Sequence, residues 1–276
     1  LMTKIKFNIE MKVLKFGGSC LKDAKSIKKI KSILELYGDD VIIVVSAFGK
    51  LTNLLESVFN SKNKDFNIVS DFFKNIMKDL SLSERLLFKN NFQYESKSEI
   101  LSIGELVSSK ILSHYFNSIG FEHFFLDATK FIKTLDAGTE ANLNWEETKT
   151  TFSNQKLENF PILTQGFISG FGTNDSFSVT CLGREGSDYS AAIFGHIFNV
   201  DEVVLFKDVD GVYDSNPKMN QKAKLLSHIN YDEAIKFFNK GNTVVHPKTI
   251  MPLKKKNIPL RIKSFYNMKN AGTLIN

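Results

Sequence analysis

Six short runs of Val, Ile, Leu and Phe constrain the fold of this chain more than any other feature. Most of these runs are continuously apolar, which is typical of β-strands covered by helices on both faces. Segments with helical periodicity separate them, so the pattern predicts an α/β fold with a mainly parallel central sheet. The expected strands lie at residues 12–16, 41–47, 123–127, 161–168, 203–207 and 259–263.

Helical periodicity is clearest in two of the intervening segments. Apolar residues recur at helical spacing within residues 24–34, and Gly38 follows as a stop signal. A second apolar stripe runs through residues 100–116, and residues 54–91 predict a polar, helical excursion. No repeat or linker divides the 276 residues, so we expect one continuous domain with a break near residues 170–175.

Composition limits the class of protein. The net charge of +6 is spread over most of the chain without a dense basic stripe, so no nucleic-acid partner is expected. No apolar run approaches the roughly 20 residues of a membrane-spanning helix, and the first residues lack a secretory signal, which predicts no membrane association and a cytoplasmic location. Cys20 and Cys181 are too few for a zinc site, and we name no metal ligand in the protein.

The first expected strand carries Lys15 and runs into Gly17, Gly18 and Ser19. Adjacent glycines let backbone N–H groups approach an anion closely, and a helix that starts nearby adds the positive end of its dipole. The loop therefore suits a phosphate, although the lysine precedes the glycines, unlike in a P-loop. A simple tight turn needs the same residues, so the loop alone is weak evidence.

A second loop at residues 183–188 leads into a helical segment at residues 189–198. Ser187 or Asp188 could simply cap that helix. Arg184 and Asp188 together exceed what capping requires, because a guanidinium group suits a carboxylate ligand and a carboxylate beside phosphate-binding loops would hold a lysine in place.

A third block follows the expected strand at residues 203–207. It begins with Lys207 and Asp208 and continues through a turn to Tyr213 and Lys218. Acidic turns are common, so each residue alone is weak evidence. The block nevertheless lies at the carboxyl end of a buried strand, where α/β sheets bind ligands.

Several motifs in a fixed order make the chain similar to the aspartate kinase branch of the amino acid kinase family. The resemblance covers nearly all of residues 11–275 and implies a three-layer αβα sandwich of the carbamate kinase-like type. It also implies ATP-dependent phosphorylation of the aspartate β-carboxylate, the first step of lysine, threonine and methionine biosynthesis. The motifs are the loops at residues 15–18, 46–53, 183–188 and 208–213, with Gly104-Glu105, Gln165-Gly166-Phe167 and Val245-His246-Pro247.

The resemblance places aspartate in an amino-terminal lobe, about residues 11–170, and ATP in a carboxy-terminal lobe, about residues 171–275. Lys15 and Asp188 would be the catalytic residues, with Lys15 on the phosphoryl oxygens and Asp188 holding that lysine. In the acceptor pocket, Arg184 would bind the α-carboxylate of aspartate and Glu105 its ammonium group, with hydroxyl contacts from Ser46 and Thr52.

The implied nucleotide site draws on both lobes. Mg²⁺ would be bound through the ATP phosphates, without a named protein ligand. Glu185 replaces a common glycine, and its carboxylate near phosphate would weaken ATP binding unless it points away. Lys218 stands where Arg is frequent, and Thr243 where a nucleotide-contacting Lys is usual. The nucleotide contacts implied are Lys15, Gly17, Gly18, Ser19, Ser187, Lys207, Asp208, Tyr213, Lys218, Thr243 and Val244.

Two other functions stay open. The chain could instead be a member of the family that phosphorylates glutamate, acetylglutamate or a nucleoside monophosphate. The pairing of Glu105 with Arg184 nevertheless favours a free amino acid, and residues 46–53 favour aspartate. The departures at Glu185 and Thr243 also leave room for a degenerate, non-catalytic fold that only binds ligands. A homodimer is one option for the assembly.

The resemblance runs through residues 271–273, close to the last residue, Asn276. Many aspartate kinases carry ACT regulatory domains after the catalytic unit. We therefore expect no ACT domain in this chain, and no inhibition by lysine or threonine at millimolar concentration, because allosteric inhibition needs a second site.

Overall fold

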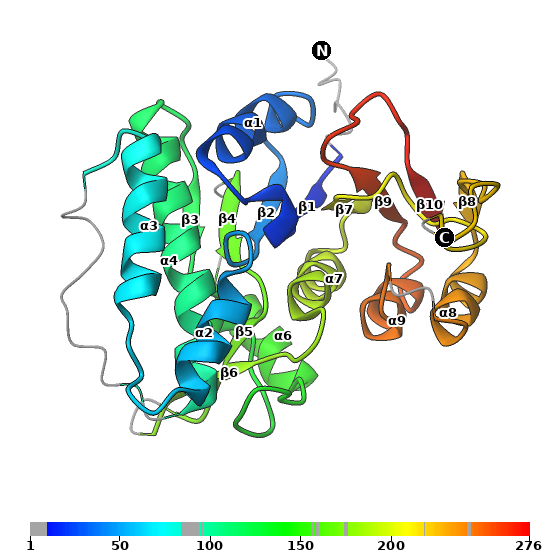
Figure 1. The fold of residues 1–276 in the computed structure, drawn as a ribbon. Helices are drawn as coiled ribbons and strands as arrows, with labels where there is room; N and C mark the ends of the chain where they lie inside the picture. Colours follow the sequence, from blue (N-terminus) through cyan, green and yellow to red (C-terminus); the bar gives the residue numbers. More distant parts are fainter. Residues whose placement is uncertain are drawn as a thin grey trace, which may run out of the picture.

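The computed structural model describes residues 10–83, 94, 96–155, 157, 160–173, 176–217, 219–241 and 244–276. Within them, eight strands form one sheet in the order β3-β4-β2-β1-β7-β9-β10-β8, and every neighbouring pair runs parallel except β9 and β10 (Figure 1). The strands are β1 (Lys12–Phe16), β2 (Val41–Val45), β3 (Phe124–Leu126), β4 (Ile162–Gln165), β7 (Glu202–Lys207), β8 (His228–Ile229), β9 (Leu260–Ser264) and β10 (Thr273–Ile275). A separate antiparallel pair is formed by β5 (Ile168–Phe171) and β6 (Ser178–Cys181).

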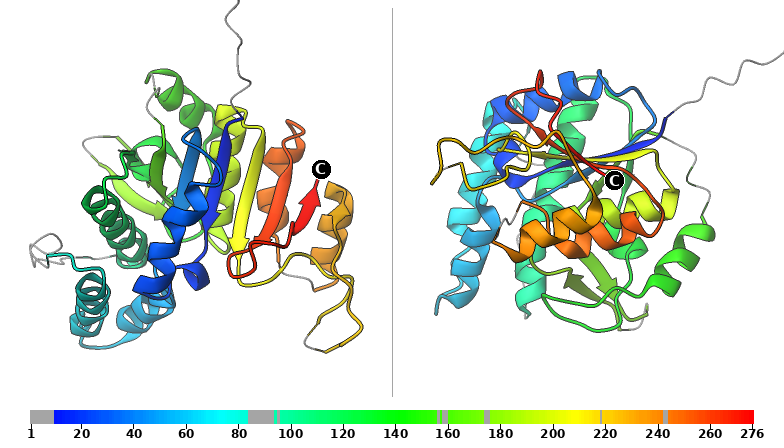
Figure 2. Two further views of the ribbon diagram at one scale, coloured as in Figure 1. Left: turned by 90° about the horizontal axis from the view of Figure 1, so that it is seen from above. Right: turned by 90° about the vertical axis from the view of Figure 1, so that its right-hand side faces the viewer.

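Helices cover both faces of the large sheet, so the molecule has three layers (Figure 2). One face carries α1 (Ala24–Leu34), α2 (Leu51–Asn60), α3 (Asn67–Asp79) and α4 (Lys97–Ser118). The other carries α5 (Ala128–Phe131), α6 (Trp145–Ser153), α7 (Gly186–Phe198), α8 (Tyr231–Asn239) and α9 (Pro247–Lys254). The predicted αβα sandwich with a mainly parallel sheet is confirmed.

The core follows the faces of the sheet rather than two lobes along the chain. Because side chains alternate along a strand, Val13 belongs to the core on the face of α7 and α9, while Leu14 belongs to the core on the face of α1 and α4. Strands β1 and β7 pair directly, with Lys15 opposite Leu205, so the expected lobes share one continuous sheet. The division into an acceptor lobe and a nucleotide lobe stays a prediction.

Local signals set the ends of the long helices. Asp23 caps α1 by accepting a hydrogen bond from the N–H of Ser26, and Gly38 stands at a φ of +77° after that helix, as the stop signal predicts. Ser96 and Glu99 form a capping box at the start of α4. Of the helical excursion expected at residues 54–91, α2 and α3 are confirmed, and residues 84–93 lie outside the described part.

The expected strands are confirmed with end shifts of one or two residues, except the run at residues 161–168. This run is wrong as one strand, because it breaks at Phe167, whose φ of +65° turns the chain from β4 into β5. Strands β5, β6, β8 and β10 were not expected, since each has only two to four residues. No helix in the described ranges is long and apolar enough to cross a membrane.

Candidate active site

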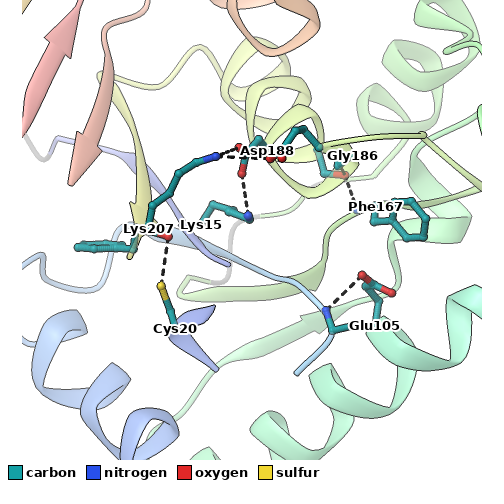
Figure 3. A network of polar contacts seen from close by, with 11 residues as sticks. Lys15, Cys20, Glu105, Phe167, Gly186, Asp188 and Lys207 are labelled. Atoms are coloured by element: carbon teal, nitrogen blue, oxygen red, sulfur yellow. Dashed lines mark hydrogen bonds and ion pairs between the residues drawn. The ribbon is translucent and has the colours of Figure 1, made fainter. Parts of the chain in front are cut away.

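A buried carboxylate joins two lysines from neighbouring strands (Figure 3). The Nζ atom of Lys15, on β1, lies 2.7 Å from Oδ1 of Asp188, and the Nζ atom of Lys207, at the end of β7, lies 2.7 Å from Oδ2. Asp188 is fully buried in the first turn of α7. Lys15 pairs with Leu205, and Lys207 lies two residues further along the same strand. Residues two apart on a strand share a face, so both lysines point to the face covered by α7.

The two lysines keep this carboxylate ionised. Burial alone would raise the pKa of Asp188, but Lys15 and Lys207 outweigh it and hold that pKa well below its ordinary range. Burial would lower the pKa of Lys207, whereas Asp188 and Glu185 raise it. The result is a cationic pair of ammonium groups around one fixed anion. The capping role considered for Ser187 and Asp188 is wrong, since Glu185 is the N-cap residue and α7 has no side-chain cap.

The glycine loop lies directly beside Lys15. A Cβ atom on Gly18 would come within 2.6 Å of the Gly49 carbonyl oxygen, and one on Gly17 would lie 3.3 Å from the Lys15 Nζ. Position 18 therefore needs a glycine, whereas the lysine tip near Gly17 could move, and a short 3₁₀-helix, Gly18–Cys20, starts inside the loop. The N–H of Gly17 donates to the Phe206 carbonyl at 3.4 Å, so this expected phosphate donor already has a partner.

Glu185 stands at the mouth of the same centre. Its φ of +54° lies in the left-handed region, where glycine is the usual residue. Its Oε2 atom is 3.4 Å from the Lys207 Nζ, so the carboxylate does not stand alone among the cations. The like-charge repulsion expected from Glu185 is therefore partly balanced by Lys207.

A cavity of about 490 Å³ opens next to this centre, and its lining includes every residue expected to bind the acceptor. Ser46, Glu105 and Lys15 are buried in its wall, whereas Arg184 is exposed. Arg184 has no ion pair with any residue that the structure describes. The members already expected from sequence are Lys15, Gly18, Ser46, Thr52, Glu105, Arg184, Glu185 and Ser187.

Glu105, in the middle of α4, presents one oxygen to the protein and keeps one free. Its Oε1 accepts a hydrogen bond from the N–H of Ala47 at 3.1 Å, whereas its buried Oε2 has no partner among the described residues. Burial raises the pKa of Glu105 to about 8, against weaker lowering by the Ala47 N–H and by Lys15. Gly104 allows this contact, because a Cβ there would lie 2.8 Å from the Ala47 Cβ.

Sequence reasoning missed several residues of the cavity. Lys97 and Glu56 form an ion pair at its rim, and Glu140 packs against Gly183. No motif marked these three. Asn53 and Phe167 also line the cavity, and both lie inside recognised motifs, so the motif spacing could have found them.

The other residues expected to contact the nucleotide, where the structure describes them, do not gather around one cavity. Asp208 is exposed after β7, Tyr213 is half-buried in an isolated β-bridge, and Val244 is half-buried in a turn. None of the three lines the acceptor cavity. Lys218 and Thr243 lie outside the described residues. Where the structure is described, no three His, Cys, Asp or Glu side chains gather as a metal site.

Comparison with known proteins identifies the family to which this arrangement corresponds. The sequence model of the amino acid kinase family matches residues 10–264. The chain belongs to the amino acid kinase family. This family member is 29% identical to a bifunctional aspartokinase/homoserine dehydrogenase of Buchnera aphidicola, over 96% of this chain and 36% of that protein. It is 30% identical to aspartokinase 3, chloroplastic, of Arabidopsis thaliana, over 95% of this chain and 52% of the relative.

Solved structures of the family give the same result. The family member matches E. coli aspartokinase III in complex with aspartate and ADP with a TM-score of 0.83 and 25% identity, covering 96% of this chain and 64% of that one. Clostridium acetobutylicum aspartate kinase matches with a TM-score of 0.80 and 27% identity, covering 96% and 63%. The resemblance to the aspartate kinase branch is confirmed. The chain spans between about a third and two-thirds of the length of these relatives.

Proposed function

We propose that this member of the amino acid kinase family transfers the γ-phosphoryl group of ATP to the β-carboxylate of aspartate. One observation carries the proposal: among the described residues, a buried oxygen of Glu105 has no partner and Arg184 has no ion pair, and both residues line a single cavity with Lys15. A free amino acid presents one ammonium group and one α-carboxylate, so it needs one anion and one cation from the protein. The aspartokinase relatives support the same acceptor.

In this proposal Arg184 binds the α-carboxylate and Glu105 receives the ammonium group, while Ser46 and Thr52 contribute hydroxyl contacts. The free Oε2 of Glu105 supports this role, because a buried oxygen without a partner is costly until a donor reaches it. An incoming ammonium group would also favour the ionised form of Glu105 over the protonated form that burial favours.

Phosphoryl transfer then needs no general base. The β-carboxylate of aspartate has a reference pKa of about 3.9 and is already ionised near neutral pH. The task of the protein is to align two anions and to offset their repulsion. Lys15 would stabilise charge that develops on the phosphoryl oxygens, and Asp188 would fix the position of Lys15. The shared contact with Asp188 supports a place for Lys207 in the same centre.

ATP would bind across the glycine loop and the turns after β7. Gly18 and Ser187 line the cavity beside Lys15, which supports a phosphate cradle there with Gly17 and Ser19 in the same loop. Asp208, Tyr213, Lys218, Thr243 and Val244 stay predictions as nucleotide contacts. Mg²⁺ bound to the phosphates would neutralise part of their charge. The described residues offer no metal-ligand group of three carboxylates, histidines or thiols, so we assign Mg²⁺ no protein ligand.

ADP release separates the proposed function from the alternatives. The purified chain is assayed with ATP and Mg²⁺ plus aspartate, plus glutamate, or without acceptor. Aspartate-dependent release that glutamate does not support would agree with the proposal. Release with glutamate alone would indicate another acceptor, and none with any acceptor would favour a non-catalytic fold. A place in lysine or threonine biosynthesis, the homodimer and the cytoplasmic location stay sequence-based predictions.

A further inference from the structure

A second cavity, of about 700 Å³, lies between α6, α7 and α9 and shares no lining residue with the acceptor cavity. Figure 1 shows these three helices together on one face of the sheet. The wall combines aromatic and apolar side chains with lysines: Trp145, Glu146, Lys149, Tyr189, His196, Lys248, Met251, Pro252, Lys254 and Lys255. We propose that this cavity binds a small organic anion with a flat apolar part.

The charge of the wall carries the first half of the proposal. Four lysines face a single carboxylate, Glu146, which pairs with Lys149. Lys254 pairs with Asp232, outside the cavity. Neither Lys248 nor Lys255 has an acidic partner within ion-pair distance among the residues described by the structure. Two positive charges therefore remain to meet an anion.

The rings of the wall carry the second half. Trp145 lies 4.8 Å from His196 between ring centroids, and Met251 is 56% exposed. Burial, together with nearby lysines, lowers the pKa of His196, and its Nδ1 hydrogen bonds to the Pro252 carbonyl, so it offers a neutral ring. Burial raises the pKa of Tyr189 to about 12, which keeps its hydroxyl a neutral donor. Such a surface suits a ligand with a flat apolar group, whereas the acceptor proposed for the first cavity is small and polar.

Lys248 links this cavity to the acceptor site. Its Nζ lies 4.9 Å from the ring centroid of Tyr189 and donates a hydrogen bond to the carbonyl of Leu182, two residues before Arg184. An anion that draws Lys248 away releases that carbonyl and shifts the loop that presents Arg184. This coupling rests on the proposed function: the ligand weakens aspartate binding, and aspartate must weaken ligand binding by the same factor.

Trp145 is the single tryptophan of the chain, so its fluorescence reports directly on this cavity. The intact chain is titrated with 1-anilinonaphthalene-8-sulfonate, which accepts energy from tryptophan, and then with 2-naphthoate or its uncharged amide as competitors. We expect quenching of Trp145 with sensitised dye emission, and displacement by naphthoate at a concentration about tenfold below that of the amide. Equal displacement by the two, or dye emission without transfer from Trp145, would overturn the proposal.

Matched variants locate the anion. Lys255→Gln and Lys248→Gln should each weaken naphthoate binding by about tenfold. Lys25→Gln, an exposed lysine on α1 at the opposite face of the sheet, should leave it unchanged. Equal affinities in Lys255→Gln and Lys25→Gln would contradict the assignment.

The coupling is read separately, as weaker naphthoate binding in the presence of saturating aspartate and a raised aspartate KM in the presence of naphthoate. Binding without this reciprocity would refute the link through Lys248 but keep the site. Inactivity towards aspartate would refute the proposed function, while the fluorescence result would still decide the site.

Discussion

The acceptor pocket and the nucleotide region were both expected from motifs, but the protein builds them from different elements. The pocket uses side chains on the sheet and on long helices, such as Lys15 on β1 and Glu105 in α4, and these are buried and held by neighbours. Apart from the lysines that it shares with this centre, the nucleotide region uses turn residues such as Asp208 and Val244. Groups on rigid elements are positioned before the ligand arrives, whereas turns adapt more readily. Changes in the first region should therefore alter catalysis, stability or both, and changes in the second region should mainly alter the affinity for ATP.

The largest contrast should come from one aspartate in each region. Asp188→Ala leaves two largely buried lysines without their shared anion, so we expect the free energy of unfolding to fall by about 3–5 kcal/mol. Asp208→Ala removes an exposed carboxylate and should change it by less than about 0.5 kcal/mol. Urea unfolding measures both, and similar values for the two variants would remove the distinction between the regions.

Loss of Lys15 should separate catalysis from folding. Lys15→Ala leaves Asp188 paired with Lys207, so the fold is retained. Turnover should fall about a hundredfold or more, because a transition-state contact of about 2.7–4 kcal/mol is lost. Steady-state kcat is measured beside circular dichroism. A folded variant that keeps more than about a tenth of the wild-type kcat would rule out this role of Lys15.

Affinity for aspartate should depend on the two charged residues of the acceptor pocket. Arg184→Ala and Glu105→Gln each remove a hydrogen bond to a charged group, worth about 1.5–3 kcal/mol, so the aspartate KM should rise at least tenfold. The KM for ATP should change little, because neither Arg184 nor Glu105 is among the proposed ATP contacts. Unchanged aspartate KM values in both variants would refute the pocket assignment.

The pH dependence should follow the same carboxyl group. Glu105 has a pKa of about 8 in the free protein, so at lower pH it must lose a proton before it can receive an ammonium group. The kcat/KM for aspartate should therefore rise by up to about tenfold per pH unit until about pH 8, and Glu105→Gln should lose this rise. A pH profile shared by both proteins would argue against Glu105.

The free energy of unfolding should fall as the pH rises, in the opposite direction to kcat/KM. The folded protein binds the Glu105 proton more tightly than the unfolded chain, in which the pKa of this carboxyl group is near 4.5. The stability that Glu105 contributes is therefore fully present below about pH 4.5 and is lost as the pH rises towards 8. The difference in unfolding free energy between wild type and Glu105→Gln, followed by urea unfolding across this range, measures that contribution.

The smallest effect should come from Glu185. Glu185→Gly relieves a left-handed backbone that costs a non-glycine residue about 1 kcal/mol, and it removes a carboxylate from the proposed phosphate site. We expect a slightly more stable protein with a lower KM for ATP. Glu185→Ala removes the charge without relieving the backbone. It should therefore lower the KM for ATP but leave the stability unchanged. If both variants bind ATP more weakly, Glu185 must assist the nucleotide by holding Lys207.

The predictions from sequence were sound where a signal is local. Apolar runs and helix caps located the strands beside the site and the helix at residues 24–34. The break at Phe167 was missed although Gly166 precedes it, because a glycine inside a strand pattern is compatible with a bulge as well as with the end of a strand. Glu56 and Lys97 were missed at the cavity rim because their partner lies on another helix.

The sequence by itself determined the alternation of strands and helices, the order of the motifs and the glycine loop beside Lys15, since each depends on neighbouring residues. Only the tertiary structure decided that Lys207 shares Asp188 with Lys15, because β1 and β7 become neighbours only when the sheet forms. It also decided the protonation of Glu105, whose pKa depends on complete burial beneath the loop after β2. Pairing and desolvation act through space, and they exist only once distant segments of the chain have packed together.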